Sequence, residues 1–137
     1  MVTEESAATR PKILCVEDEA GMLDLLRLIL ESAGYTFVGA RDGQEGLDAM
    51  VREQPDLILL DLMLPEVPGA EVLLRKKQNP AIQQIPVIAV TAMSSPFDQM
   101  MWIHRTEIKV YVTKPFMRKQ LLSAIEQVLG GASGRPE

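Results

Sequence analysis

The chain has 137 residues, of which 47% are hydrophobic, and it carries a net charge of −5. This length allows one domain with a sizeable core and leaves no room for a second. The acidic balance argues against a chain that binds nucleic acid through a broad basic field, because affinity for phosphate backbones needs clustered Lys and Arg over such a surface.

Two features of the hydropathy pattern argue against membrane insertion and secretion. The longest apolar stretches, Leu25–Leu30 and Leu57–Leu64, are each interrupted by a charged residue and fall far short of the roughly 20 residues that span a bilayer. The N-terminus lacks the apolar core of a signal peptide. The only cysteine, Cys15, allows neither an internal disulfide nor a cysteine-based zinc site. We therefore expect a cytoplasmic protein that does not associate with membranes.

Both ends of the chain have the composition of tails. Residues 1–10 are rich in Ser, Thr, Ala and Glu without periodicity, and residues 130–137 contain three glycines and a proline. We expect a disordered tail over 1–10, a flexible tail over 130–137 and one domain over 11–129.

Between these tails, a short apolar run is followed by an amphipathic segment five times. The expected strands are Lys12–Val16, Thr36–Ala40, Asp56–Asp61, Ile85–Val90 and Val110–Thr113. The expected helices run over about Ala20–Ala33, from Asp42 to before Pro55, over about Gly69–Lys77, from Ser95 onward, and over about Pro115–Leu129. Gly34 is placed to end the first helix, and Asp42 is a good N-cap for the second.

The composition of the strands indicates how the sheet is covered. Leu57–Leu60 and Val87–Val90 are apolar at every position, which is typical of parallel strands covered by helices on both faces. Five strand–helix units are too few for a closed eight-fold barrel. The fold class is therefore α/β, with an open, doubly wound parallel sheet.

Polar residues follow the expected strands where a ligand of such a sheet would bind. They are Glu17 and Asp18, Asp61, Thr91 and Lys114. Ligands of open α/β sheets bind outside the carboxyl ends of the strands. These five side chains meet there if the strands that carry them are central neighbours.

The chemistry of these residues points to a divalent cation and a phosphoryl group. Three carboxylates in one crevice repel one another, and Mg²⁺ prefers such oxygen ligands together with water and phosphate. An aspartate beside Mg²⁺ can attack phosphorus, and Asp61 is the best nucleophile candidate because it ends the most apolar strand. Lys114 and Thr91 are suited to binding the phosphoryl oxygens.

Four motifs, in this order, resemble the receiver domains of two-component response regulators over almost the whole chain. They are Val-Glu-Asp-Glu at 16–19, Leu-Leu-Asp-Leu-Met-Leu-Pro at 59–65, Val-Thr-Ala at 90–92 and Thr-Lys-Pro-Phe at 113–116. The resemblance implies a flavodoxin-like, five-stranded sheet in order 2-1-3-4-5, with five helices distributed over both faces. That order places the first and third strands side by side.

The resemblance also implies a phospho-acceptor switch. Asp61 would take a phosphoryl group from a sensor histidine kinase or a phosphotransfer protein. Mg²⁺ would be held by the side chains of Glu17, Asp18 and Asp61 and by the backbone carbonyl of Met63. Glu17 stands where many relatives have Asp, and its longer side chain should still reach the metal.

Further roles implied by the resemblance concern the response to phosphorylation. Thr91 and Lys114 would bind the phosphoryl group, and Tyr111 would turn inward as Thr91 moves. This change would alter a surface formed by the fourth helix, the fifth strand and the fifth helix, where a downstream target or a second copy of the chain would bind. Trp102, on the fourth helix, is expected to point outward. The Lys114–Pro115 peptide bond would be cis.

One segment departs from the family pattern, because 103–110 lacks the glycine turn that relatives carry before the last strand. Two alternatives remain beside the signalling function. A haloacid-dehalogenase-type phosphatase would also use an aspartate nucleophile, but it needs an acid two residues later, where this chain has Met63. A degenerate receiver would serve only as a protein-binding scaffold. We expect a signalling domain, not an enzyme, that catalyses only its own phosphorylation and dephosphorylation.

Overall fold

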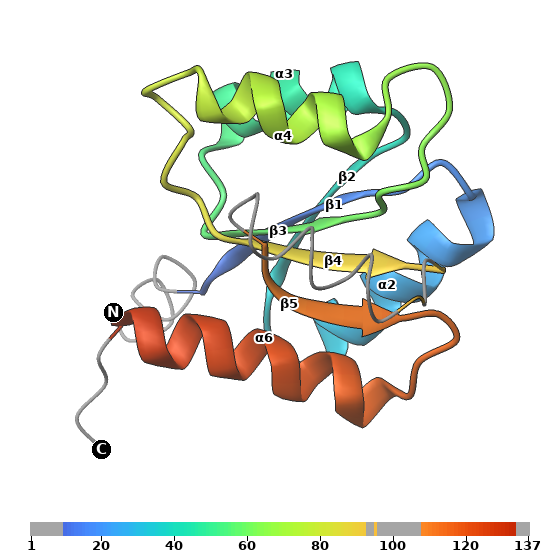
Figure 1. Ribbon diagram of the computed structural model, residues 1–137. Coiled ribbons are helices and arrows are strands. Elements are labelled where there is room, and N and C mark those ends of the chain that lie inside the picture. Colours follow the sequence, from blue (N-terminus) through green and yellow to red (C-terminus); the bar gives the residue numbers. More distant parts are fainter. Residues whose placement is uncertain (1–9, 93–94, 96–107, 134–137) are drawn as a thin grey trace.

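Five parallel strands form one central sheet (Figure 1). The computed structural model describes residues 10–92, 95 and 108–133. The strands are β1 (Lys12–Val16), β2 (Thr36–Ala40), β3 (Leu57–Leu60), β4 (Val87–Thr91) and β5 (Ile108–Thr113). Their order is β2-β1-β3-β4-β5, and every neighbouring pair is parallel. The predicted strand order is confirmed.

Helices cover both faces of this sheet. The described residues contain α2 (Ala20–Ser32), α3 (Gly43–Glu53), α4 (Gly69–Lys77) and α6 (Arg118–Ser133). In Figure 1, α3 and α4 lie on one face of the sheet, and α2 and α6 lie on the other. The helix expected from Ser95 onward, together with Trp102, lies outside the described residues except for Ser95 itself. Four of the five expected helices are thus described.

The core consists of two apolar layers, one on each face of the sheet. Side chains of β3 enter both layers: Ile58 and Leu60 pack on the α3 and α4 side, while Leu57 and Leu59 pack on the α2 and α6 side. All four are at most 1% exposed. This alternation explains why the strand is apolar at every position. No helix in the described part of the chain is long and apolar enough to span a membrane.

The predicted helix boundaries are confirmed at two positions. The Asp42 carboxylate accepts a hydrogen bond from the Glu45 backbone N–H at 2.8 Å, which caps α3. Gly34 has a φ of +94°, the left-handed region that glycine adopts easily, two residues after α2 ends. These local signals set where the chain turns back toward the sheet.

Strand boundaries differ from the prediction where proline and a bulge intervene. β4 begins at Val87 instead of Ile85, because Pro86 has no N–H to donate to the sheet. β5 begins at Ile108 instead of Val110, and Lys109 is an extra residue between the pairings of β5 with β4. Such a bulge bends the strand and increases its local twist.

Smaller differences occur at β3 and α6. β3 comprises Leu57–Leu60, and Asp56 precedes it: its N–H donates to the Lys12 carbonyl at 2.8 Å, and its carboxylate accepts from the Lys12 N–H at 2.7 Å. α6 begins at Arg118 instead of Pro115 and continues to Ser133, past the predicted boundary at Leu129. Glycine lowers helix propensity by only about 1 kcal/mol per residue, so the glycines at 130 and 131 do not stop the helix.

Candidate functional site

The acidic residues meet at the carboxyl edge of the sheet because β1 and β3 are neighbours. Glu17 and Asp18 follow β1, and Asp61 follows β3. The Asp61 backbone N–H donates to the Val16 carbonyl at 3.1 Å, and the Glu17 N–H donates to the Ala40 carbonyl at 3.0 Å. These bonds extend the sheet past its last residues and fix both acidic segments against each other.

Lys114 joins the two buried carboxylates. Its ammonium donates to Glu17 Oε1 at 2.7 Å and to Asp61 Oδ2 at 3.0 Å. The Glu17 and Asp61 residues are 2% and 6% exposed, whereas Asp18 is exposed to solvent. Lys114 is held at the end of β5 by its backbone N–H, which donates to the Thr91 carbonyl at 2.9 Å. The Lys114–Pro115 peptide bond is cis, as expected.

The electrostatics of the cluster follow from its burial. Burial raises the pKa of Glu17, although hydrogen bonds from Lys114 and from the Glu19 backbone N–H lower it in part. Burial alone would lower the pKa of Lys114, but its hydrogen bonds to Glu17 and Asp61 outweigh that effect and raise it. Two of the three carboxylate groups therefore share one protonated ammonium, and the cluster favours an additional cation.

The geometry fits a hard divalent cation. One carboxylate oxygen from each of Glu17, Asp18 and Asp61 lies within 4.8 Å of the others. Oxygen ligands from a few carboxylates, completed by water and phosphate, are what Mg²⁺ prefers. The exposed Asp18 leaves one side of this set open to solvent. The backbone of Met63 lies next to the Asp61 carboxylate, because the Met63 N–H donates to Asp61 Oδ1 at 2.9 Å.

Thr91 and Tyr111 lie on the strands beyond β3. Thr91 is the last residue of β4 and is fully buried. Tyr111 lies opposite Ala89 in the register of β4 and β5, and it packs against the core on the α3 and α4 face. The structure thus places Thr91 at the carboxyl edge and Tyr111 farther back on β5, while their roles in binding and switching stay predictions.

One residue at this edge is missing from the sequence analysis. The guanidinium of Arg41 lies with Nε and Nη2 each 3.4 Å from the Asp18 backbone carbonyl oxygen. Arg41 directly follows β2, which is the other neighbour of β1. Its position directly after a strand end is the signal in the sequence that marks Arg41, although the strand before it is followed by neither an acid of the cluster nor Thr91 nor Lys114.

Comparisons with known proteins agree with this geometry. Residues 13–126 match the family model of the response regulator receiver domain. The polar-differentiation response regulator DivK of Brucella anthropi is 37% identical over 120 residues, which cover 88% of this chain and 97% of that protein.

Solved structures are also similar to this chain in sequence and fold. The chemotaxis protein CheY4 of Vibrio cholerae is 25% identical with a TM-score of 0.82, covering 88% of this chain and 100% of that one. The receiver domain of the sensor histidine kinase PA1611 of Pseudomonas aeruginosa, with a magnesium ion coordinated in its active-site cleft, is 26% identical with a TM-score of 0.80. It covers 89% of this chain, and the match spans 99% of that one. This chain belongs to the family of response regulator receiver domains.

Proposed function

We propose that Asp61 is the residue that accepts the phosphoryl group in this phospho-acceptor signalling switch. The observation that carries the proposal is the position of its carboxylate at the end of a buried strand, 3.0 Å from the Lys114 ammonium. Glu17 and Asp18 supply further carboxylate oxygens within 4.8 Å. The burial of this aspartate and its place in the cluster support a role as a nucleophile beside a cation site over that of a solvated surface charge.

The metal site that we propose uses Glu17, Asp18 and Asp61, with the backbone carbonyl of Met63 as a further ligand. A bound Mg²⁺ would supply positive charge that offsets the repulsion between the carboxylates and the incoming phosphoryl oxygens. Lys114 would then move part of its hydrogen bonding from the carboxylates to a phosphoryl oxygen, and the Thr91 hydroxyl would donate to another.

The transfer itself exchanges one bond to phosphorus for another. A carboxylate oxygen of Asp61 attacks the phosphorus of a phosphohistidine, so that an O–P bond forms and the N–P bond breaks. The donor imidazole leaves with the electron pair of the N–P bond and is neutral, because its other ring nitrogen already carries a proton. The product is an acyl phosphate on Asp61.

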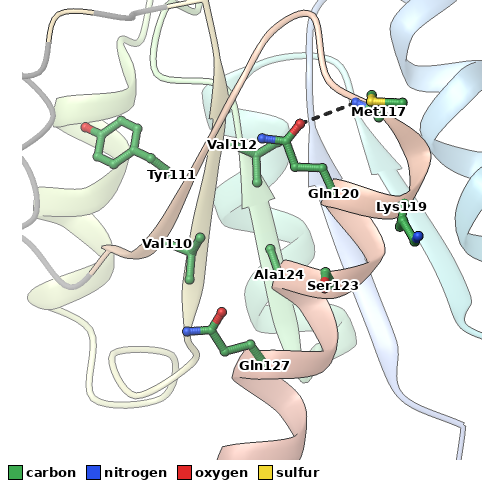
Figure 2. A pocket seen from close by; sticks show the side chains of 9 residues that line it. All are labelled: Val110, Tyr111, Val112, Met117, Lys119, Gln120, Ser123, Ala124 and Gln127. Carbon is green, nitrogen blue, oxygen red and sulfur yellow. Dashed lines mark hydrogen bonds between the residues drawn. The ribbon is translucent and has the colours of Figure 1, made fainter.

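Receiver domains interact with histidine kinases and with downstream targets, and we propose where this chain meets its target. A pocket of about 500 Å³ lies between β5 and α6 (Figure 2). Val110 and Val112 of β5 and Ala124 of α6 give it an apolar part, while Gln120 and Gln127 offer amide groups. We propose that this pocket is part of the surface that a target or a second copy of the chain recognises. That surface would comprise β5, α6 and the helix expected from Ser95 onward.

Tyr111 links this pocket to the acceptor site in the proposed switch. In Figure 2 its ring points away from α6, while its strand neighbours Val110 and Val112 flank the pocket. Because Tyr111 is itself one of the residues that line the pocket, a movement of its side chain on phosphorylation would change the pocket directly. The lack of any further enzymatic activity and the cytoplasmic location stay predictions.

Intact-mass measurement after treatment with acetyl phosphate and Mg²⁺ tests the proposed acceptor. We expect the wild-type protein to gain the mass of one phosphoryl group, and we expect no gain for Asp61→Asn or for wild type in excess chelator. A matched control is Asp48→Asn, because Asp48 is an exposed aspartate on α3. A phosphoryl adduct on the Asp61→Asn protein would contradict the proposal.

A further inference from the structure

We infer that Arg41 is a recognition residue that draws anionic phosphodonors to the acceptor site. The inference rests on the proposed function, because it assumes that a phosphoryl group is delivered to Asp61. It adds a specificity-determining group directly after β2, outside the strands that carry the acceptor, the predicted metal ligands, Thr91 and Lys114.

The position of the Arg41 backbone is fixed from two sides. Its N–H donates to Glu45 Oε1 at 2.6 Å, and the N–H of Glu45 donates to the Asp42 carboxylate at 2.8 Å. Both bonds belong to the capping arrangement at the start of α3. The preceding residue, Ala40, accepts a hydrogen bond from Glu17. Arg41 is therefore anchored next to the acidic segment after β1.

The Arg41 side chain extends back over that segment. Its guanidinium contacts the Asp18 carbonyl oxygen through two nitrogens at 3.4 Å, and the residue is exposed to solvent. Within the described residues, no carboxylate forms an ion pair with this guanidinium. Its charge is therefore available to an arriving ligand, unlike that of Lys114, whose ammonium already binds Glu17 and Asp61.

The negative charge of the carboxylate cluster makes a positive charge at Arg41 important for an anionic donor. Three carboxylate groups repel an anionic donor, and the partly buried Lys114 ammonium and a bound Mg²⁺ would offset that repulsion, so Arg41 adds a further positive charge nearer to solvent. A planar guanidinium with several N–H donors matches the oxygens of a phosphate group. Arg41 lies beside Asp18, the solvent-exposed member of the cluster, and is itself exposed.

Phosphorylation rates with two donors of different charge test the inference. Near neutral pH acetyl phosphate is a dianion and phosphoramidate a monoanion. For charges about 8 Å apart in water, Arg41→Gln should lower the second-order rate constant about fivefold with acetyl phosphate and about twofold with phosphoramidate at low ionic strength. Both effects should vanish at about 1 M salt, where charges are screened beyond about 3 Å.

Two further variants separate recognition from a structural role. Arg41→Lys keeps the charge and should restore most of the rate. Arg52→Gln changes the net charge equally at an exposed site near the end of α3, away from the acidic segment, and should leave both rates at the wild-type value.

The outcomes distinguish this inference from the proposed function. Equal slowing of both donors at every salt concentration would show that Arg41 only holds the Asp18 segment, and it would overturn the inference. Wild-type rates for Arg41→Gln would overturn it as well, while leaving Asp61 as the acceptor. If the wild-type protein took up no phosphoryl group from either donor, the proposed function and the inference would fall together.

Discussion

Replacing Lys114 by methionine should destabilise the metal-free protein and be partly rescued by Mg²⁺. The ammonium binds Glu17 at 2.7 Å and Asp61 at 3.0 Å, and both residues are almost fully buried. Removing one partner of a buried ion pair costs about 3–5 kcal/mol, because the remaining charges lose their compensation. Water can reach this cluster through the exposed Asp18, so we expect a loss of about 2–3 kcal/mol.

A surface ion pair of similar length provides the control. Arg75 Nε lies 2.8 Å from Glu71 Oε2 on α4, but these side chains are 45% and 41% exposed. Because exposed pairs contribute about 0–1 kcal/mol, Arg75→Met should cost less than about 1 kcal/mol. The comparison holds the distance nearly constant and changes the burial.

Urea unfolding in chelator measures the stability lost in Lys114→Met, and urea unfolding in Mg²⁺ measures how much of that loss the cation restores. The pKa of Lys114 is raised, so its contribution to stability is fully present below its ordinary value of 10.5 and is lost only as the pH rises through the higher folded-state value. A measurement at about pH 7.5 therefore captures the whole contribution. A cation at 100 times its Kd adds about 2.7 kcal/mol to the folded state. Because the bound ion would take over the neutralisation of the carboxylates, the gap between Lys114→Met and wild type should narrow in Mg²⁺. If Lys114→Met cost no more than Arg75→Met in chelator, the reasoning about the buried cluster would be refuted.

Three further changes test other parts of the site. Gly69→Ala should lower the free energy of unfolding by about 1–3 kcal/mol, because an added Cβ would lie 2.6 Å from the Leu62 Cα. Gly21→Ala should instead be neutral or stabilising, because an added Cβ there would have no atom within 4 Å. Equal effects of the two substitutions in urea unfolding would contradict this prediction. Met63→Asn should shorten the lifetime of the aspartyl phosphate, because an amide can orient water and the exposed thioether cannot; phosphate release at the wild-type rate would argue against it. Glu17→Gln should flatten the pH dependence of stability in chelator. Burial raises the pKa of Glu17, so its contribution to stability is fully present below its ordinary value of 4.5 and is lost as the pH rises through the higher folded-state value. Wild type should therefore lose stability relative to the variant as the pH rises above 4.5, and parallel curves would exclude this role.

The sequence allowed the acidic site to be predicted because strand ends are encoded locally. Asp61 follows four apolar residues, and Lys114 precedes a proline, so both positions could be located without any contact in three dimensions. The meeting of Glu17 with Asp61 was a different kind of prediction. It depended on the strand order, which came from the family resemblance and not from the residues themselves.

Features that depend on packing between distant segments could not be predicted in this way. Lys76 lies within a run of three basic residues, yet it is only 2% exposed, and its ammonium donates to the Gln83 carbonyl at 2.9 Å. A charge pattern does not distinguish a buried lysine from its solvated neighbours. The contact of Arg41 with Asp18 likewise depends on the pairing of β2 with β1.

The bulge at Lys109 illustrates a third limit, because a bulge is set by the pairing of two strands. The sequence pattern predicted a start of the strand at Val110, whereas β5 begins two residues earlier, at Ile108. An extra residue on one strand is accommodated only in the context of its partner, here β4.

Chemical mapping of the phosphorylated residue tests the central claim most directly. Borohydride reduces an acyl phosphate on aspartate to homoserine, and fragmentation of the reduced peptides locates the changed position. After phosphorylation with acetyl phosphate and Mg²⁺, we predict homoserine at position 61 and unchanged residues at Asp18 and Glu17. Homoserine at position 18, or a phosphoryl group that survives reduction on another residue, would contradict the assignment of Asp61 as the acceptor.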